Sequence, residues 1–272
     1  MRTALVTGAA RGIGRATVEE FLLHGWRVVA AVRDVEAARD TLPERDDLIV
    51  VSMDVTDHRQ VRAAVELAQQ AAGGALDAVV SNAGYALVGA IEDVAMDEVR
   101  AVLETNALGA LAVIQAALPA MREAGRGSFV FVSTVGADLP TPLLGAYRAS
   151  KAALNAFADV LAMEVRPFGI RVARVEPGMV ATEFSRSTRR SGAIAEGEGP
   201  YAELFGGLRD GMGVWRSRYD IGPEVVASEV VRLAEERDPP SVVPVGDDAV
   251  HLATLDEDGL LDFLGIVWPR RP

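Results

Sequence analysis

Two periods of hydrophobic residues alternate along the chain. Short apolar runs are separated by longer stretches in which apolar residues recur every three or four positions. Short runs bounded by turn residues are typical of buried strands, and the longer period is typical of amphipathic helices. The short runs predict strands at residues 3–7, 27–32, 48–53, 76–81, 127–132, 171–175 and 242–245. The longer stretches predict helices at residues 11–24, 56–72, 97–123, 145–167 and 223–236.

Strands that alternate with helices in this way predict an α/β fold, a Rossmann-like, doubly wound parallel sheet of about seven strands with helices on both faces. No segment repeats at a fixed period, and 272 residues of which 50% are hydrophobic fit a single domain, residues 1–272. Right-handed crossovers bring the C-terminal ends of parallel strands to one edge, where we expect ligands to bind.

The composition changes between residues 183 and 222, which are rich in serine, arginine and glycine and end at a helix-start signal, Gly222-Pro223. One interpretation is a disordered surface loop. The other, which we favour, is an inserted lid over a substrate, because long loops often have this function. The segment carries apolar side chains that a lid would offer to a ligand: Tyr201, Leu204, Phe205, Met212 and Trp215. Residues 255–268 are apolar enough to pack back onto the body of the protein.

Charge and composition exclude several classes of function. A net charge of −12 argues against a nucleic-acid partner, because binding phosphates needs a basic face. The chain has no cysteine, and its three histidines, at positions 24, 58 and 251, are not spaced as metal ligands, so we expect no metal centre. No apolar run is long enough to span a bilayer, and the N-terminus does not look like a secretory signal, so we expect a soluble, cytoplasmic protein.

A glycine-rich turn, Thr-Gly-Ala-Ala-Arg-Gly-Ile-Gly at residues 7–14, follows the first predicted strand and leads directly into the first predicted helix. Glycine lets the backbone approach a pyrophosphate, and the start of a helix supplies unpaired N–H groups. The spacing differs from G-x-G-x-x-G, and a tight turn without a ligand is the alternative. Its place at the first strand–helix junction favours a dinucleotide site. This site would be formed by Gly8, Arg11, Gly12, Ile13 and Gly14.

The end of the second predicted strand indicates which dinucleotide binds. A carboxylate at this position would bind a ribose 2′-hydroxyl and repel a 2′-phosphate. Here the strand ends at Val32 and is followed by Arg33, while Arg11 lies in the glycine-rich turn. Two guanidinium groups can bind a phosphate together, which favours NADP(H). Asp34 keeps NAD open, because a small error in the strand end would bring its carboxylate to the ribose.

A tyrosine and the single lysine of the chain, Tyr147 and Lys151, lie four residues apart within a predicted helix. Residues at this spacing share one helix face. A nearby ammonium favours the phenolate, so we expect the pKa of Tyr147 to fall toward a range useful for proton transfer. All 26 other basic residues are arginines, which suggests that arginine cannot replace Lys151.

Five motifs in this order resemble the short-chain dehydrogenase/reductase family. They are residues 7–14, Ser-Asn-Ala-Gly at 81–84, Asn106 within 105–109, the Tyr-x-x-x-Lys pair at 147–151, and Pro-Gly-Met-Val-Ala-Thr at 177–182. The resemblance covers about residues 3–182 and extends more loosely to the C-terminus. It implies an oxidoreductase that acts on a small-molecule carbonyl or alcohol, and a homo-tetramer or homo-dimer that associates through the long predicted helices.

The resemblance also implies roles for individual residues. Tyr147 would exchange a proton with the substrate oxygen, Lys151 would lower the pKa of the phenol and hold the ribose, and Asn106 would organise a proton relay through water. Thr134 stands where the family usually has a serine that binds the substrate oxygen. The neighbouring Ser133 would point to the other face of the strand, as a buried hydroxyl. The remaining cofactor contacts implied are Asp54, Val55, Asn82, Ala83, Gly84, Pro177, Gly178, Val180 and, at the carboxamide, Thr182.

Three functions remain open. The long segment 183–222 and the stretch 238–246 look like the hydroxysteroid and retinol dehydrogenase branch, which favours a bulky apolar ketone or alcohol. A 3-oxoacyl-carrier-protein reductase is the second possibility, if Arg186, Arg189 and Arg190 form a docking patch for an acidic carrier. The third is a regulator that binds NADP(H) without catalysis, which the presence of Tyr147, Lys151 and Asn106 argues against.

Overall fold

The computed structural model describes residues 1–184, 188–252 and 254. The C-terminal stretch 255–268, expected to pack on the body, and Arg186 lie outside the described residues.

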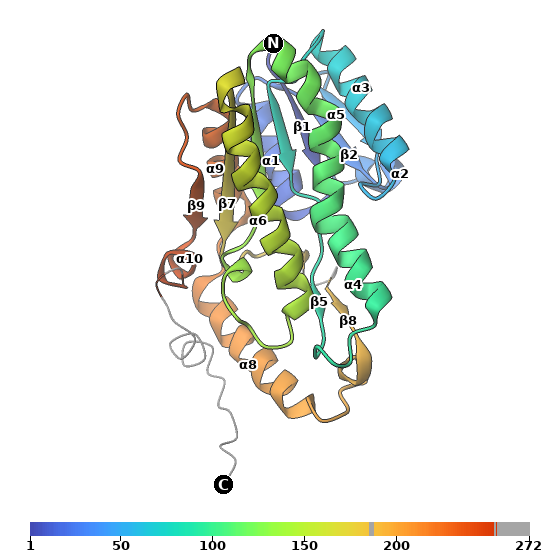
Figure 1. Ribbon diagram of the computed structural model, residues 1–272, viewed down its shortest axis with the longest axis vertical. Helices are drawn as coiled ribbons and strands as arrows, with labels where there is room; N and C mark the ends of the chain where they lie inside the picture. Colours follow the sequence, from blue (N-terminus) through green and yellow to red (C-terminus); the bar gives the residue numbers. More distant parts are fainter. Residues whose placement is uncertain (185–187, 253, 255–272) are drawn as a thin grey trace.

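The centre of the fold is a parallel sheet of seven strands, as the sequence predicts (Figure 1). Its order is β3-β2-β1-β4-β6-β7-β9. The direction of strand order reverses between β1 and β4, which places a crevice at their C-terminal ends. The strands are β1 (Thr3–Thr7), β2 (Arg27–Val32), β3 (Leu48–Ser52), β4 (Ala78–Ser81), β6 (Gly127–Val132), β7 (Ile170–Pro177) and β9 (Val242–Val245).

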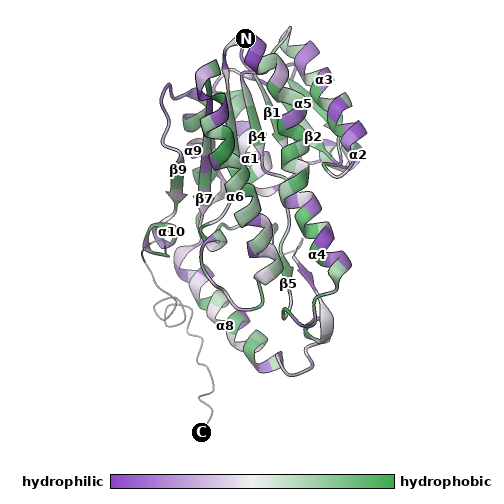
Figure 2. Ribbon diagram, in the orientation of Figure 1, coloured by the Kyte–Doolittle hydropathy of each residue, from purple (hydrophilic) through white to green (hydrophobic). Residues whose placement is uncertain are grey.

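Helices cover both faces of this sheet. The helices α1 (Gly12–Leu23) and α9 (Pro223–Glu235) pack together on one face, and α3 (His58–Ala72), α5 (Gly109–Ala124) and α6 (Gly145–Val165) cover the other. Alternate residues of β1 supply the two cores: Leu5 packs on the side of α3 and α5, while Ala4 and Val6 pack on the side of α1. Figure 2 shows the strands mainly in the green of hydrophobic residues, with purple on the outer helices.

The helix predicted over residues 97–123 is divided. It consists of α4 (Met96–Leu103), a π-helical turn (Glu104–Leu108) and α5. Such turns often occur at functional sites, and this one contains Asn106. The whole stretch, Met96–Ala124, is by length and composition the one candidate membrane span within the described residues, but 44% of its most apolar window is buried in the fold. Core helices of globular proteins pass the same test.

The segment 183–222 contains regular structure that the sequence pattern did not predict. It includes β8 (Arg189–Arg190), a 3-10 turn (Gly192–Glu196) and α8 (Ala202–Tyr219), and β8 pairs with β5 (Leu87–Val88). Glycines at positions 206, 207, 211 and 213 obscure the helical period. Packing of Leu208, Met212 and Trp215 of α8 into a third hydrophobic cluster compensates for them. In Figure 1, α8 lies beyond the C-terminal ends of the strands.

Two further short helices border the same edge of the sheet, α2 (Val35–Arg39) and α10 (Asp247–Leu252), and neither was predicted. Short 3-10 turns also occur at Val135–Ala137 and Arg166–Phe168.

Candidate active site

A cavity of about 1780 Å³ opens at the C-terminal edge of the sheet. It is lined by the segments that follow the strands of the sheet from β1 to β7, and by α8. Pockets for one small ligand usually measure about 300–1,000 Å³, so this volume can hold a dinucleotide and a second molecule together.

The glycine-rich turn at one end of the cavity has a backbone that only glycine adopts readily. Gly8 and Gly12 have φ angles of 64° and 53°, in the left-handed region. A Cβ on Gly14 would lie 2.3 Å from the carbonyl oxygen of Gly8, so glycine is also needed there for α1 to approach β1. Arg11 makes no side-chain cap to α1, and the uncapped amides at the start of this helix are therefore suited to a pyrophosphate.

The residues after β2 lie where the adenosine ribose of a dinucleotide would be. The strand ends at Val32, as predicted, and both Arg11 and Arg33 are exposed and line the cavity. Asp34 also lines the cavity, but its carboxylate accepts a hydrogen bond from the Ala37 N–H at 3.1 Å and caps α2. This bond uses one oxygen of the exposed carboxylate, so the other oxygen still faces the cavity as a possible ribose ligand.

The motif Asn82-Ala83-Gly84, which follows β4, is hydrogen-bonded to the end of β1 and the start of the glycine-rich turn. The side-chain amide of Asn82 donates to the carbonyl oxygens of Thr7 at 2.9 Å and Gly8 at 3.2 Å. The backbone N–H groups of Asn82 and Ala83 both donate to the hydroxyl of Thr7 at 3.0 Å. Asn82, Ala83 and Gly84 line the cavity, so this motif shapes the cradle beside the glycine-rich turn.

The pair Asp54 and Val55, expected at the adenine, also lines the cavity. Asp54 accepts hydrogen bonds from the N–H of Thr56 at 2.9 Å and from its hydroxyl at 2.8 Å. A Cβ on Gly109 would lie 2.8 Å from a methyl group of Val55, so the π-helical turn brings α5 close to this loop.

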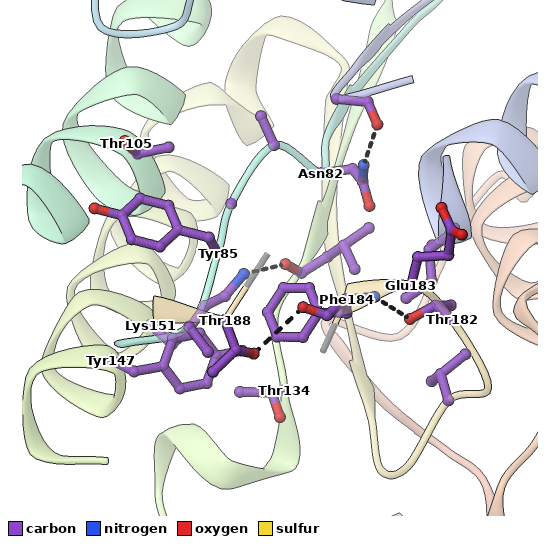
Figure 3. A pocket seen from close by; sticks show the side chains of 18 of the residues that line it. Asn82, Tyr85, Thr105, Thr134, Tyr147, Lys151, Thr182, Glu183, Phe184 and Thr188 are labelled. Carbon is purple, nitrogen blue, oxygen red and sulfur yellow. Dashed lines mark hydrogen bonds between the residues drawn. The ribbon is translucent and has the colours of Figure 1, made fainter. Parts of the chain in front are cut away.

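Tyr147 and Lys151 project from α6 into the same cavity (Figure 3). Lys151 is buried, and its Nζ donates to the carbonyl oxygen of Val132 at 2.8 Å. Burial lowers the pKa of Lys151 to about 8 and raises the pKa of Tyr147. This direction is opposite to the fall in the pKa of Tyr147 that the spacing suggested, because desolvation of the phenol penalises its charged form. At neutral pH Tyr147 carries its proton and Lys151 is charged.

Asn106 is buried beneath this pair. Its Oδ1 accepts from the Tyr85 N–H at 3.0 Å, and its Nδ2 donates to the Tyr85 carbonyl oxygen and the Ser150 hydroxyl, each at 2.9 Å. A Cβ on Gly84 would lie 2.9 Å from this Oδ1 and 3.8 Å from Nζ of Lys151. The observed contacts of Asn106 hold the segment after β4 against α6, and the proton relay stays a prediction.

Two adjacent hydroxyl groups at the end of β6 have different surroundings. The hydroxyl of Thr134 accepts from the Gly136 N–H at 3.2 Å and donates to the Pro177 carbonyl oxygen at 3.4 Å, and Thr134 lines the cavity near Tyr147 (Figure 3). Ser133 is buried and donates to Oδ1 of Asn155 at 2.6 Å. The prediction that Ser133 is a buried hydroxyl is confirmed.

The end of β7 and the segment after it form another part of the cavity lining. Pro177, Gly178, Val180 and Thr182 all line it, and the Thr182 hydroxyl accepts from the Phe184 N–H at 3.2 Å. The ring of Phe184 lies 6.2 Å from that of Tyr147, centre to centre, as Figure 3 shows. Phe184 has no local signal in the sequence, because its position depends on how this segment folds back.

Asp248 is a second residue that the sequence analysis missed. It is fully buried in the first turn of α10 and accepts hydrogen bonds from the N–H groups of Met179 at 2.7 Å and Ala249 at 2.8 Å. A Cβ on Gly178 would lie 2.2 Å from its carboxylate oxygens. Asp248 thus fixes the backbone between Gly178 and Val180, and burial raises its pKa. The adjacent acids Asp247-Asp248 were visible in the sequence, but nothing there shows which one is buried.

Comparison with known proteins places these features in one family. Residues 2–192 match the family model described as short chain dehydrogenase. The chain is 33% identical to oxidoreductase BOA17 of Botryotinia fuckeliana over 250 residues, which are 91% of this chain and 90% of the relative. It is 37% identical to 3-alpha-(or 20-beta)-hydroxysteroid dehydrogenase of Mycobacterium tuberculosis over 185 residues, 68% of this chain and 71% of the relative.

Solved structures agree with this placement. A short-chain dehydrogenase from Streptomyces avermitilis superposes with a TM-score of 0.83 at 33% identity, covering 96% of this chain and 94% of the other. A 3-ketoacyl-(acyl-carrier-protein) reductase from Brucella melitensis complexed with NADH has a TM-score of 0.76 at 26% identity, with coverages of 90% and 96%. A Burkholderia cenocepacia short chain dehydrogenase in complex with NADP has a TM-score of 0.74 at 26% identity, with coverages of 97% and 99%.

Proposed function

This chain belongs to the short-chain dehydrogenase family of oxidoreductases, and on that premise we propose that it transfers a hydride between NADP(H) and a bulky, apolar ketone or secondary alcohol. One observation carries the proposal. Tyr147 and Lys151 face the same cavity as the glycine-rich turn, so a proton donor and a dinucleotide cradle share one space.

The side chains of the site can carry out the proton transfer. In reduction, the Tyr147 hydroxyl donates its proton to the carbonyl oxygen, and in oxidation the phenolate accepts the proton of the alcohol. The phenol of Tyr147 is protonated at neutral pH, as proton donation in reduction requires, and its raised pKa makes it a weaker acid than a free tyrosine. A bound nicotinamide supplies or accepts the hydride at the carbon atom. Together the hydride and the proton convert a ketone into an alcohol.

Lys151 and Thr134 assist from two sides. The Lys151 ammonium, held by Val132, would bind the ribose hydroxyls. The Thr134 hydroxyl is held by the Gly136 N–H, and its bond of 3.4 Å to Pro177 is long enough to be exchanged for one to the substrate oxygen. A threonine therefore supplies the donor that a serine would supply, with one added methyl group.

The choice of NADP(H) rests on the residues after β2. Arg11 and Arg33 offer two guanidinium groups to a 2′-phosphate, and one oxygen of the Asp34 carboxylate is engaged at the start of α2. Related structures bind NADH in one case and NADP in another. The preference is therefore a property to measure on this chain.

The proposed apolar substrate follows from the apolar side chains that line the cavity outside the glycine-rich turn. Side chains of α8 line it together with residues from other segments. The apolar members are Leu139, Leu144, Met179, Phe184, Phe205, Leu208, Met212 and Trp215.

The test is turnover of a ketone panel, from small β-keto esters to steroids, with NADPH and separately with NADH, followed by nicotinamide absorbance. We expect faster turnover with NADPH on bulky ketones and loss of turnover in Tyr147→Phe. Tight NADPH binding without turnover of any ketone would favour a regulator that binds the cofactor without catalysis.

A second candidate is reduction of a 3-oxoacyl chain carried by an acyl carrier protein. Arg189 and Arg190, exposed at the cavity, favour it because carrier proteins are acidic. The same 3-oxoacyl group on a carrier protein and on a short thioester would be compared, and a preference for the protein thioester would support this candidate.

A further inference from the structure

The charge of the cavity is opposite to that of the chain. The whole sequence has 27 basic and 39 acidic residues. Among the described residues that line the cavity, seven are basic and four are acidic. Arg11, Arg33 and Lys151 serve the cofactor in the proposed function. The other four basic residues, Arg189, Arg190, Arg209 and Arg216, belong to β8 and α8, on the substrate side.

The first two of these arginines are held in place by secondary structure. Arg189 and Arg190 form β8, and the N–H groups of Arg189 and Ser191 donate to the carbonyl oxygens of Ala86 and Val88, each at 2.9 Å. The two guanidinium groups meet different rings, and both arginines line the same cavity. Arg189 lies 4.6 Å from the ring centre of Tyr85, and Arg190 lies 5.1 Å from that of Phe205.

These two guanidinium groups retain their hydrogen-bonding capacity. Within residues 1–184, 188–252 and 254, neither forms an ion pair with a carboxylate. Glu98 and Arg189 are the charged residues that affect the pKa of the Tyr85 phenol. The carboxylate of Glu98 accepts a hydrogen bond from the Ser191 hydroxyl. A stacked guanidinium keeps its N–H groups at its edge, where they can bind two oxygens of an anion.

The arginines of α8 differ from this pair. Arg209 pairs with its neighbour Asp210 at 2.8 Å, and Arg216 pairs with Asp220 at 3.5 Å. They contribute positive potential at the mouth of the cavity but are partly neutralised. Arg189 and Arg190 are therefore the residues suited to direct contact with an anion.

We infer that the substrate is an apolar carbonyl compound that carries an anionic group, a carboxylate or a phosphate, at a distance from the reacting carbonyl. Arg189 and Arg190 bind this group while the apolar part of the molecule lies against Phe184 and α8. The inference rests on the proposed function, because it names the substrate class of the same site. A surface arginine is usually only solvated, but here two arginines fixed by strand pairing and by aromatic rings border an apolar cavity in an acidic protein.

The experiment compares three ketones with the same carbon skeleton, in which several methylenes separate the ketone from a terminal carboxylate, its methyl ester, or a phosphate. Each is assayed with wild-type protein and with Arg189→Gln, Arg190→Gln and the double variant. Arg62→Gln, an exposed arginine on α3, is the control that makes the same change in net charge as each single variant.

We expect kcat/KM of the wild-type protein for at least one anionic ketone to exceed that for the ester by about ten-fold or more, as a charge-assisted hydrogen bond would give. The double variant should reduce this ratio to near one, Arg62→Gln should leave it unchanged, and salt should weaken it. The better anion identifies the group that is bound.

Three results would overturn the inference. A wild-type preference for the ester would overturn it while leaving the proposed function intact. An acid-to-ester ratio that survives in the double variant would show that other groups select the anion. Absence of turnover for every ketone with either cofactor would overturn the proposed function as well, which separates the two failures.

Discussion

Burial sets the protonation states of Tyr147 and Lys151, the two groups expected to act on the proton. Desolvation penalises the charged form of each, so the phenol holds its proton more strongly and the ammonium holds its proton less strongly than in water. Proximity of the two residues in the sequence suggested only that the ammonium would favour the phenolate. The surroundings of α6 decide which effect is larger.

Lys151 should make stability depend on pH. Its folded-state pKa of about 8 is below the usual 10.5, so the cost of burying its charge is fully present below pH 8 and decreases as pH rises toward 10.5. Relative to Lys151→Met, the wild-type free energy of unfolding should rise by about 2 kcal/mol between roughly pH 7 and 9.5. Urea unfolding of both proteins at the two pH values measures this difference, and an unchanged difference would contradict it.

Thr134 should act through its hydroxyl alone. Thr134→Val keeps the shape of the side chain but removes the donor, and we expect kcat to fall by about a hundred-fold or more, as for loss of one oxyanion donor. Thr134→Ser keeps the donor and should retain activity within about three-fold. Steady-state kinetics with any ketone that the wild-type protein reduces measures both effects. An equal loss of kcat in the two variants would assign Thr134 a packing role.

At the scale of elements, the site depends on contacts between segments distant in the sequence. Asn106, in the π-helical turn, holds the backbone of Tyr85, while Asp248, in α10, holds the segment after β7. Such contacts leave no local signature in the sequence. The helix α8 is a similar case, because its glycines weaken the periodic pattern and its packing against a hydrophobic cluster restores the helix.

The contact of α10 with the segment after β7 can be tested with a matched pair of acids. Asp248→Asn removes an acceptor from one buried N–H group, so we expect a loss of about 1–3 kcal/mol in stability and a higher KM for NADPH. Asp247→Asn, the exposed neighbour on the same helix, should change stability by less than about 0.5 kcal/mol. Thermal unfolding and cofactor titration measure both effects. Equal behaviour of the two variants would remove the role assigned to Asp248.

At the scale of the whole molecule, the helices expected to join subunits carry exposed apolar side chains. Leu108, Val160, Met163 and Phe168 are all exposed, on or next to α5 and α6. Isolated exposed apolar residues are ordinary, but several on neighbouring helices are typical of an interface. This arrangement supports the expected homo-dimer or homo-tetramer.

A charge placed on this surface should separate the subunits. Met163 lies on α6 and is 78% exposed. The variant Met163→Glu would bury a carboxylate at the expected interface, so we expect the mass in solution to fall to that of one chain, 28.8 kDa. Leu23→Glu, 76% exposed on α1, should leave the assembly unchanged. Light scattering during gel filtration distinguishes these results, and a wild-type protein that is already monomeric would contradict the expectation.

The sequence by itself determined the features that local interactions specify. Hydrophobic periodicity fixed the seven strands and the main helices, because burial of one face requires it. The glycine-rich turn and the spacing of Tyr147 and Lys151 are equally local. Only the tertiary structure decided that α8 is a helix, that Phe184 lies against Tyr147, that Asp248 is the buried acid of its pair, and that burial raises the pKa of the phenol. These features depend on packing and desolvation by residues far away in the chain, which no local pattern contains.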